Sequence, residues 1–524
     1  MSSLLHKLLV ATSVVSVLGQ TSYYNPNIKT DGPADFHSVF ERKVAYDYGG
    51  ESDGFGKSVA VHGNTMLIGS CFSDTHGSQG GNAHIFTLDT GDTPSSTNGW
   101  KYVTSLNAND TYPYDFFGWD VALSYKVAAV GAWQADDPLE NTGAVYIFES
   151  ASSGEWSSYT ILRGTYASEY FGISVALDWD GSVLLVGAAG HPSAEGETGG
   201  YGAVYAFRKG NNGAWHKKSL MLAQDGGSKY DYFGISVALE GRIGVVGAYG
   251  SDPGTGESAG SAYVVNGDNQ GNNWLVVQKL VASDSDQNSF FGRKVALRNG
   301  TMVIGADGDS EAAPSAGAVY IFRQGSNSGN WKEKQKITPE SEEGYDLFGT
   351  SVALWGNHLV VGAAGAIANN VKSGSVHIYE SDSDGKNWAL LTTLSASDAS
   401  SSDKYGASVA IHGDVILVGA ELADGFDYNS GAVYAYTTVP DYFFYFDPSL
   451  SSTELSLLTV GAFLFSAAVV LWAFKSGKLN SVVSKDCYFG AMGHNPDFDA
   501  SRRGDFEMAD DSAHSSSSRQ PLRS

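Results

Sequence analysis

The sequence predicts an all-β fold, namely a seven-bladed β-propeller of four-stranded antiparallel blades, followed by one transmembrane helix and a disordered tail. Three observations lead to this prediction. One phrase recurs seven times at a nearly constant spacing, each copy carries short apolar segments, and two apolar stretches lie near the chain ends. A repeat of this length is typical of architectures in which one supersecondary unit is stacked many times.

The recurring phrase begins with an aromatic residue and glycine, and it ends in Val-Gly-Ala or a close variant. Successive first aromatics lie 54 to 62 residues apart along the chain. Because a period of this size accommodates four short strands, each copy predicts one blade. The seven first aromatics are Phe55, Phe117, Phe171, Phe233, Phe291, Phe348 and Tyr405.

Four apolar segments in each copy predict four strands. The first follows Phe-Gly, the second is the Val-Gly-Ala run, the third is of the Gly-Ala-Val-Tyr-Ile-Phe type, and the fourth opens at a tryptophan in six copies. None of them has a sustained helical period, so antiparallel blades are expected rather than a bundle, and blades suit the period better than an up-and-down barrel does. The last copy lacks a fourth strand. Residues 39–46 have that pattern, so we expect them to complete the last blade.

The two ends of the chain predict a single-pass type I membrane protein. An early lysine, an apolar run and small residues indicate a secretory signal peptide. Near the other end, twenty residues without a charge are long enough to cross a hydrocarbon core of about 30 Å, and lysines follow them. The predicted domains are a signal peptide (1–19), an N-terminal segment (20–38), the propeller (39–438), a juxtamembrane linker (439–454), a transmembrane helix (455–474) and a cytoplasmic tail (475–524).

The net charge of -25 lies almost wholly in the predicted extracellular part. An acidic surface repels nucleic acid, so we expect no nucleic-acid partner. Asn109 and Asn299 begin N-glycosylation sequons on the predicted lumenal side, which predicts a glycoprotein. The plasma membrane is the expected location, with a secretory-pathway organelle as the alternative. The sequence does not indicate a binding partner for the predicted cytoplasmic tail.

The phrase Phe-Gly…Ser-Val-Ala-Leu…Val-Gly-Ala…Gly-Ala-Val-Tyr-Ile-Phe resembles the FG-GAP repeat, the blade of the integrin α-subunit propeller. The resemblance covers residues 39–438 and implies a propeller that binds ligands on the face with the long loops. The calcium loop of that family, Asp-x-Asp/Asn-Gly-Asp, is replaced here by tight hairpins. We therefore expect no cofactor, although calcium stays open, and we expect a relative of the integrin α propeller rather than an integrin chain.

Four aspartates provide the weak metal candidates. Asp178 and Asp180 share the one hairpin with two carboxylates, and Asp284 and Asp286 alternate as calcium ligands do. Calcium takes about six to eight oxygen ligands, so the two carboxylates of the first pair are too few. The second pair lacks the glycine and the distal glutamate of a calcium loop, so chance is the favoured interpretation there.

The long loops predict the ligand site, because binding residues on rigid scaffolds concentrate in loops. In a four-stranded meander, the loops between strands 2 and 3 and between strands 4 and 1 emerge at the same end of the blade. The candidates on that face are Trp133, Asp136, Asp137, His191, Glu195, Tyr249, Asp252, Asp307 and Asp309.

An acidic residue also lies two positions before the first aromatic in six copies, and Ser289 takes its place in the other. It is either a ring of channel-rim carboxylates that holds a cation or basic ligand, or an acceptor for backbone N–H groups at each turn. Recurrence in nearly every blade favours the architectural interpretation. The six residues are Asp53, Asp115, Glu169, Asp231, Asp346 and Asp403.

No catalytic motif accompanies these residues: the chain has no G-x-S-x-G elbow, no His-Glu-x-x-His and no phosphate loop. We therefore expect a non-enzymatic surface glycoprotein whose propeller binds a protein or glycan ligand in adhesion or as a receptor. Two alternatives stay open. One is a membrane-tethered carbohydrate-active enzyme with paired carboxylates, and the other is a structural protein of a secretory-pathway organelle.

Overall fold

The computed structural model describes Phe36 and residues 39–438, except 47–48, 76, 89–98, 138, 152–153, 157, 194–199, 254–256, 285, 326–328, 341–343 and 383–384. The predicted signal peptide, transmembrane helix and tail lie outside the described residues. Within the described part, the chain forms strands and turns, and no helix is long and apolar enough to cross a membrane.

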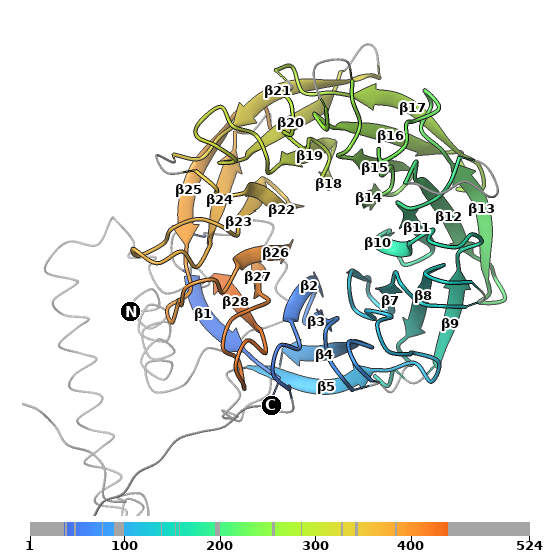
Figure 1. The fold of residues 1–524 in the computed structure, drawn as a ribbon, viewed down its shortest axis with the longest axis horizontal. Coiled ribbons are helices and arrows are strands. Elements are labelled where there is room, and N and C mark those ends of the chain that lie inside the picture. The colour runs from blue at the N-terminus through green and yellow to red at the C-terminus, as the bar shows by residue number, and fades with distance from the viewer. Residues whose placement is uncertain are drawn as a thin grey trace, which may run out of the picture. The chain divides into compact units, whose positions relative to one another are not determined.

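In the described part of the chain, twenty-eight strands form seven four-stranded antiparallel sheets arranged in a closed ring (Figure 1). Blade 1 contains β2 (Phe55–His62), β3 (Thr65–Ser70), β4 (Asn82–Leu88) and β5 (Trp100–Leu106). Blade 2 contains β6 (Val121–Leu123), β7 (Val127–Ala132), β8 (Ala144–Glu149) and β9 (Ser158–Arg163). Blade 3 contains β10 (Phe171–Leu177), β11 (Val183–Ala188), β12 (Ala203–Lys209) and β13 (Trp215–Met221).

The remaining blades follow in the same order. Blade 4 contains β14 (Ser236–Glu240), β15 (Ile243–Ala248), β16 (Ser261–Gly267) and β17 (Trp274–Leu280). Blade 5 contains β18 (Lys294–Arg298), β19 (Thr301–Ala306), β20 (Ala318–Gln324) and β21 (Trp331–Ile337). Blade 6 contains β22 (Phe348–Trp355), β23 (His358–Ala363), β24 (Ser375–Ser381) and β25 (Trp388–Leu394). Blade 7 contains β26 (Tyr405–His412), β27 (Val415–Ala420), β28 (Ala432–Thr438) and β1 (Val39–Val44). The seven predicted blades are therefore confirmed.

Ring closure uses both ends of the propeller, as the sequence predicts. Strand β1 pairs antiparallel with β28, with Val39 opposite Thr438 and Val44 opposite Val433. A side-chain contact adds to this pairing, because the Tyr436 hydroxyl donates to Glu41 at 2.8 Å. A strand from one end of the chain thus completes the sheet of the other end, which leaves the ring without a gap.

Glycine backbones account for the recurrence of Phe-Gly and Val-Gly-Ala. A Cβ placed on the Val-Gly-Ala glycine of one blade would overlap the carbonyl oxygen of the Phe-Gly glycine in the next blade. The pairing runs through all seven blades, and the contact of Gly419 with Gly56 closes the circle. Only glycine allows two backbones to approach this closely. The repeated phrase is therefore the contact between blades.

Aromatic rings fill the space inside each blade. The buried Phe171 ring meets the Tyr205 ring edge-on at 5.1 Å, and Phe233 meets Tyr263 in the same way at 5.1 Å. Edge-to-face pairs of this kind stabilise a core beyond the burial of area. The recurring aromatic of the phrase is thus a core residue.

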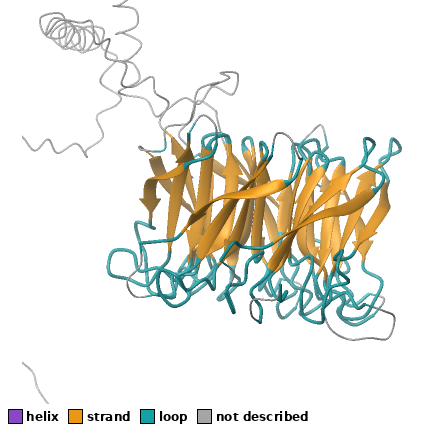
Figure 2. Cartoon of the chain, turned by 90° about the horizontal axis from the view of Figure 1, so that it is seen from above, coloured by secondary structure: helices purple, strands orange, loops and turns teal. Residues whose placement is uncertain are grey.

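The two faces of the ring differ in their connections (Figure 2). On the loop face lie the connections between second and third strands and those that lead into the next blade. On the hairpin face lie the short turns between first and second strands. Strand β1 begins and strand β28 ends on the hairpin face, because β1 is a fourth strand and β28 is a third strand.

Candidate functional site

Eight half-buried aromatic rings lie at the loop-face ends of the inner strands, over blades 1 to 5. We call this set the aromatic belt. Its members flank Phe-Gly or follow Val-Gly-Ala in their copies, and blades 6 and 7 have no aromatic ring at these positions. The aromatic belt comprises Phe72, Phe116, Trp119, Trp133, Tyr170, Tyr232, Tyr249 and Phe290.

The rings of the aromatic belt contact one another in two runs. In the first run, Trp133 stacks on Phe116 with centroids 5.7 Å apart and meets Tyr170 edge-on at 5.0 Å. In the second run, Tyr249 stacks on Tyr232 at 5.3 Å and meets Phe290 at 5.8 Å. The rings are thus held by each other, so they offer a preorganised surface to a ligand.

A cation lies over each run of the aromatic belt. The Lys57 Nζ atom is 4.7 Å from the Trp119 ring and 2.9 Å from a carboxylate oxygen of the buried Glu421. The Arg293 guanidinium is 5.1 Å from the Tyr249 ring and 3.2 Å from Asp307. Each of these two cations therefore already has a carboxylate partner.

The turn that carries the aromatic belt has a strained backbone. The residue before the recurring aromatic adopts a positive φ in every blade, for example 57° at Tyr170, Tyr232 and Phe290. Left-handed φ costs a bulky residue free energy and persists only where its surroundings enforce it. Four of the eight belt rings, those of Phe116, Tyr170, Tyr232 and Phe290, stand at this position.

The six recurrent carboxylates lie at these turns. Asp53, Asp115, Asp231 and Asp403 each accept the backbone N–H of the residue three positions earlier, at 2.7 to 2.8 Å. Glu169 accepts from Tyr166 at 2.9 Å, and Asp346 is half-buried. Such contacts are what the architectural interpretation expects. Burial raises the pKa of Asp53, Asp231 and Asp403, and it raises the pKa of Asp115 to about 6.

Of the candidates predicted from the sequence, Trp133 and Tyr249 lie in the aromatic belt. Asp136 accepts the backbone N–H of Asn141 at 2.7 Å, and Asp252 accepts that of Ser258 at 2.6 Å, so these two carboxylates hold their own loops.

The other candidates lie elsewhere on the face. The exposed Asp137 pairs with Arg163 at 2.9 Å, and His191 is buried with its Nε2 atom 3.6 Å from Glu169. Glu195 lies outside the described residues.

The weak metal candidates are engaged by groups of the chain. The Lys336 Nζ atom lies 2.6 Å from Asp284, 2.9 Å from Asp309 and 2.6 Å from Glu311, and Asp286 is exposed. Asp178 accepts the N–H of Val183, which shapes the hairpin of blade 3 together with Asp180. In the described part of the chain, no group of three His, Cys, Asp or Glu side chains is placed to hold a metal ion.

A second recurrent aspartate was missed by the sequence reasoning. It follows the fourth strand in an Ala-x-Asp pattern and pairs with a cation on the fourth strand of the next blade, as in Lys279 with Asp225 at 2.6 Å. The third-strand tyrosine of that next blade donates to it, as Tyr263 does at 3.2 Å. The Ala-x-Asp pattern recurs at Asp110, Asp225, Asp284 and Asp398. This recurrence in the sequence is the signal that could have identified these aspartates.

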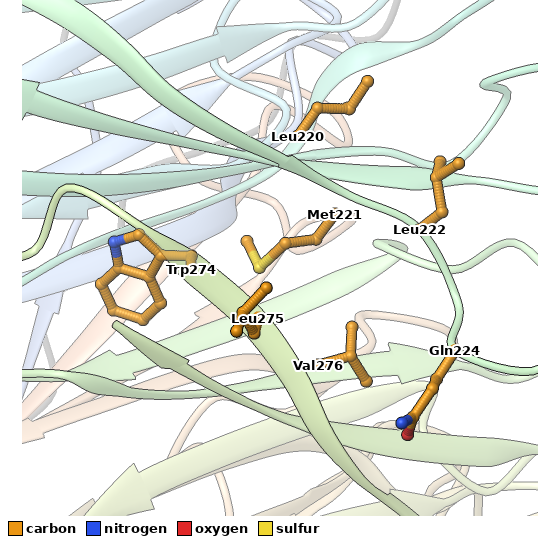
Figure 3. Close-up of a pocket in the computed structure, with 7 residues that line it drawn as sticks. All are labelled: Leu220, Met221, Leu222, Gln224, Trp274, Leu275 and Val276. Atoms are coloured by element: carbon orange, nitrogen blue, oxygen red, sulfur yellow. The ribbon is translucent and has the colours of Figure 1, made fainter. Parts of the chain in front are cut away.

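An apolar hollow of about 240 Å³ lies between the outer strands β13 and β17 (Figure 3). Leucine, methionine, valine and tryptophan side chains line it, and Gln224 is its one polar side chain. Ligand sites combine apolar walls with several placed polar groups. This hollow therefore ranks below the aromatic belt as a site.

The closed ring and the glycine contacts between blades define a β-propeller repeat protein. The model of the FG-GAP repeat matches residues 40–86, 100–148, 215–265, 274–322, 331–379 and 388–436, which is more than half of the chain. The chain belongs to the FG-GAP repeat family. The matched segments leave out residues 149–214, which include the inner strands of blade 3.

Two further comparisons add little. No curated protein matches the chain. Among solved structures, it is similar to a putative 6-phosphogluconolactonase from Bacteroides uniformis, with 8% sequence identity, a TM-score of 0.43, and coverage of 66% of this chain and 86% of that chain. A likeness at this level carries no argument about activity.

Proposed function

We propose that the chain is a single-pass type I membrane glycoprotein whose propeller binds an extracellular protein or glycan ligand through its loop face, in adhesion or recognition. The observation that carries the proposal is the aromatic belt. Its rings are half-buried and braced, and they lie on the face opposite to the one where β1 begins and β28 ends.

The chemistry of the aromatic belt suits recognition. Tryptophan and tyrosine provide large rigid contact areas with little side-chain entropy to lose, and such residues dominate the energetics of binding surfaces. Their flat faces also pack against the C–H faces of sugar rings. Because Lys57 and Arg293 already have carboxylate partners, we expect the rings rather than these two cations to contact the ligand.

The direction of the last strand supports an outward-facing site. Strand β28 ends at Thr438 on the hairpin face, and the predicted linker and transmembrane helix follow it in the sequence. A tether that leaves from the hairpin face would leave the loop face free for ligands from outside the cell. The exposed side chains of Asn109 and Asn299 are compatible with the predicted glycosylation.

The test is a binding screen of the purified full-length chain against a glycan array and a panel of cell-surface proteins. Trp133→Ala and Tyr249→Ala should each lower the affinity for any ligand found by about tenfold or more. Phe426→Ala is the matched control, because Phe426 is 64% exposed on the loop face outside the aromatic belt. The proposal would be contradicted if both belt substitutions left the affinity unchanged, or if neither screen found a ligand.

The same experiment separates the two alternatives. Cleavage of a retained glycan would favour a membrane-tethered carbohydrate-active enzyme. Imaging of a tagged chain inside an organelle, with no surface pool, would favour a structural protein of the secretory pathway.

A further inference from the structure

Residues of all seven blades line a depression of about 190 Å³ at the centre of the hairpin face, which we call the hairpin-face mouth of the central channel. One apolar residue per blade contributes at equivalent positions: Val61, Leu123, Leu177, Leu239, Leu297, Leu354 and Ile411. The residue that follows varies among the copies, with histidine occurring twice: His62, Ser124, Asp178, Glu240, Arg298, Trp355 and His412. A symmetric apolar ring is thus followed by an asymmetric polar and aromatic one.

Blade 3 contributes the side chain of Trp179 to this mouth. Its connection from Leu177 to Val183 is longer than the two-residue hairpins, and Asp178 holds it by accepting the N–H of Val183 at 2.9 Å. Trp179 extends from this connection to the rings of His62 at 4.6 Å and His412 at 5.4 Å. These two rings belong to blades 1 and 7, so Trp179 reaches across the channel.

Arg298 has no hydrogen-bond partner at this mouth. Its guanidinium lies 4.3 Å from the Trp355 ring and 5.0 Å from the Trp179 ring. Its buried Nε atom is 3.8 Å from Glu240, too far for a hydrogen bond, and no described residue accepts from the guanidinium. A guanidinium carries five N–H donors, and buried donors are normally satisfied. Arg298 is therefore a cation that lies over rings, with a carboxylate 3.8 Å away and no hydrogen bond to a described residue.

His412 provides a second unsatisfied donor. Its Nδ1 atom accepts the backbone N–H of Gly63 at 3.2 Å, which assigns the ring proton to Nε2. The buried Nε2 atom has no partner among the described residues. Burial lowers the pKa of His412 to about 4, so the ring is neutral at pH 7. The acceptor nearby, Glu240, already accepts the backbone N–H of Asn299 at 3.0 Å.

We propose that the hairpin-face mouth of the channel binds a small carboxylate attached to a ring. The carboxylate accepts from Arg298 and His412, and the ring packs against Trp179 and Trp355. Charge-assisted hydrogen bonds to guanidinium are among the strongest in proteins, and aromatic walls strengthen them by excluding water. A volume of about 190 Å³ accommodates one ring rather than a chain of them. This site is separate from the loop face, so either proposal can fail alone.

The test is a calorimetric titration of the full-length chain with four probes: glucuronate, benzoate, glucose and acetate. Glucuronate or benzoate should bind at least about tenfold more tightly than both glucose, which lacks the carboxylate, and acetate, which lacks the ring. Because the predicted glycan at Asn299 adjoins Arg298, an Asn299→Gln chain is titrated alongside.

Arg298→Gln should weaken the tighter probe by about tenfold or more. Arg42→Gln is the matched control, because it removes the same charge on the outermost strand β1 of blade 7 and should leave this affinity unchanged. Trp179→Leu is a second variant, at a side chain that is 52% exposed, and it should weaken binding while the chain stays folded. The proposal is overturned if neither ring-bearing carboxylate exceeds glucose and acetate, or if folded Arg298→Gln and Trp179→Leu chains both bind as the parent does.

Discussion

The two ends of the propeller axis carry similar residue types, namely cations over aromatic rings, but these cations differ in how closely they pair with carboxylates. At the loop-face mouth, Lys57 and Arg293 lie over aromatic rings and also pair with Glu421 and Asp307. At the hairpin-face mouth, Arg298 also lies over aromatic rings, but its nearest carboxylate, Glu240, is 3.8 Å away and no described residue accepts a hydrogen bond from it. This difference shows that two criteria select different sites: loop length selects the loop face, and hydrogen-bond donors without acceptors select the hairpin-face mouth. Long loops indicate an exposed surface for a large ligand, and unsatisfied donors indicate a small polar one.

The largest effect should come from the backbone contacts under the loop-face mouth. Gly187→Ala places a methyl group against the carbonyl of Gly234 in the next blade and should lower the free energy of unfolding by about 3 kcal/mol or more. Gly413→Ala, in a hairpin with open space around it and a φ of 61°, should cost only about 1 kcal/mol. Denaturant unfolding measures both. Equal costs would contradict the interpretation of the repeated glycines as the contact between blades.

A smaller difference should separate the cations of the two faces. Lys336→Ala leaves Asp284, Asp309 and Glu311 without their shared cation and should destabilise the chain by about 2 kcal/mol, because its side chain is only 15% exposed. Arg298→Ala removes no hydrogen bond and should cost less than about 1 kcal/mol. Thermal melts check this order. Millimolar calcium should recover part of the loss in Lys336→Ala but not in Arg298→Ala, and a reversed order would refute the comparison.

Acidification should affect the two faces in opposite directions. Burial raises the pKa of Asp115 on the loop face to about 6, above its unfolded value of about 3.9. The folded state therefore gains stability from Asp115 as the pH falls through 6. Burial lowers the pKa of His412 on the hairpin face to about 4, below its unfolded value of about 6.5. Its contribution is present above pH 6.5 and is lost as the pH falls through 4.

Melting temperatures of Asp115→Asn and His412→Asn between pH 7 and 4 measure these two contributions against the parent. Asp115→Asn should lack the gain on acidification, and His412→Asn should lack the loss while it keeps an acceptor for Gly63. Parallel profiles for all three chains would show that neither group titrates as described.

The smallest effect concerns the turns that lead into the loop face. Ser402 is exposed and has a φ of 74°, so Ser402→Gly should stabilise the chain by about 0.5 kcal/mol. Ser401→Gly, at a neighbour without positive φ, should instead destabilise it slightly. On the other face, hairpin turns such as the one at Gly413 already use glycine, and Asn299, with a φ of 49°, is a hairpin position where a similar gain is open.

Part of the candidate site could be predicted from the sequence. Trp133 and Tyr249 were identified because they follow Val-Gly-Ala in loops on the expected face. The acidic candidates were less informative, because a carboxylate in the sequence does not reveal its partner. Asp136 and Asp252 accept backbone N–H groups of their own loops, and Asp309 lies beside Lys336 from another strand.

The sequence by itself determined the seven blades, their four strands and the closing strand β1. These features follow from local patterns and from glycines whose backbones must approach one another, so they repeat along the chain. Only the tertiary structure decided the hairpin-face mouth. His62 and His412 are far apart in sequence, and their rings lie 4.8 Å apart because the ring closes between blades 7 and 1. Contacts made by closure leave no periodic trace in the sequence, since each blade contributes a different residue.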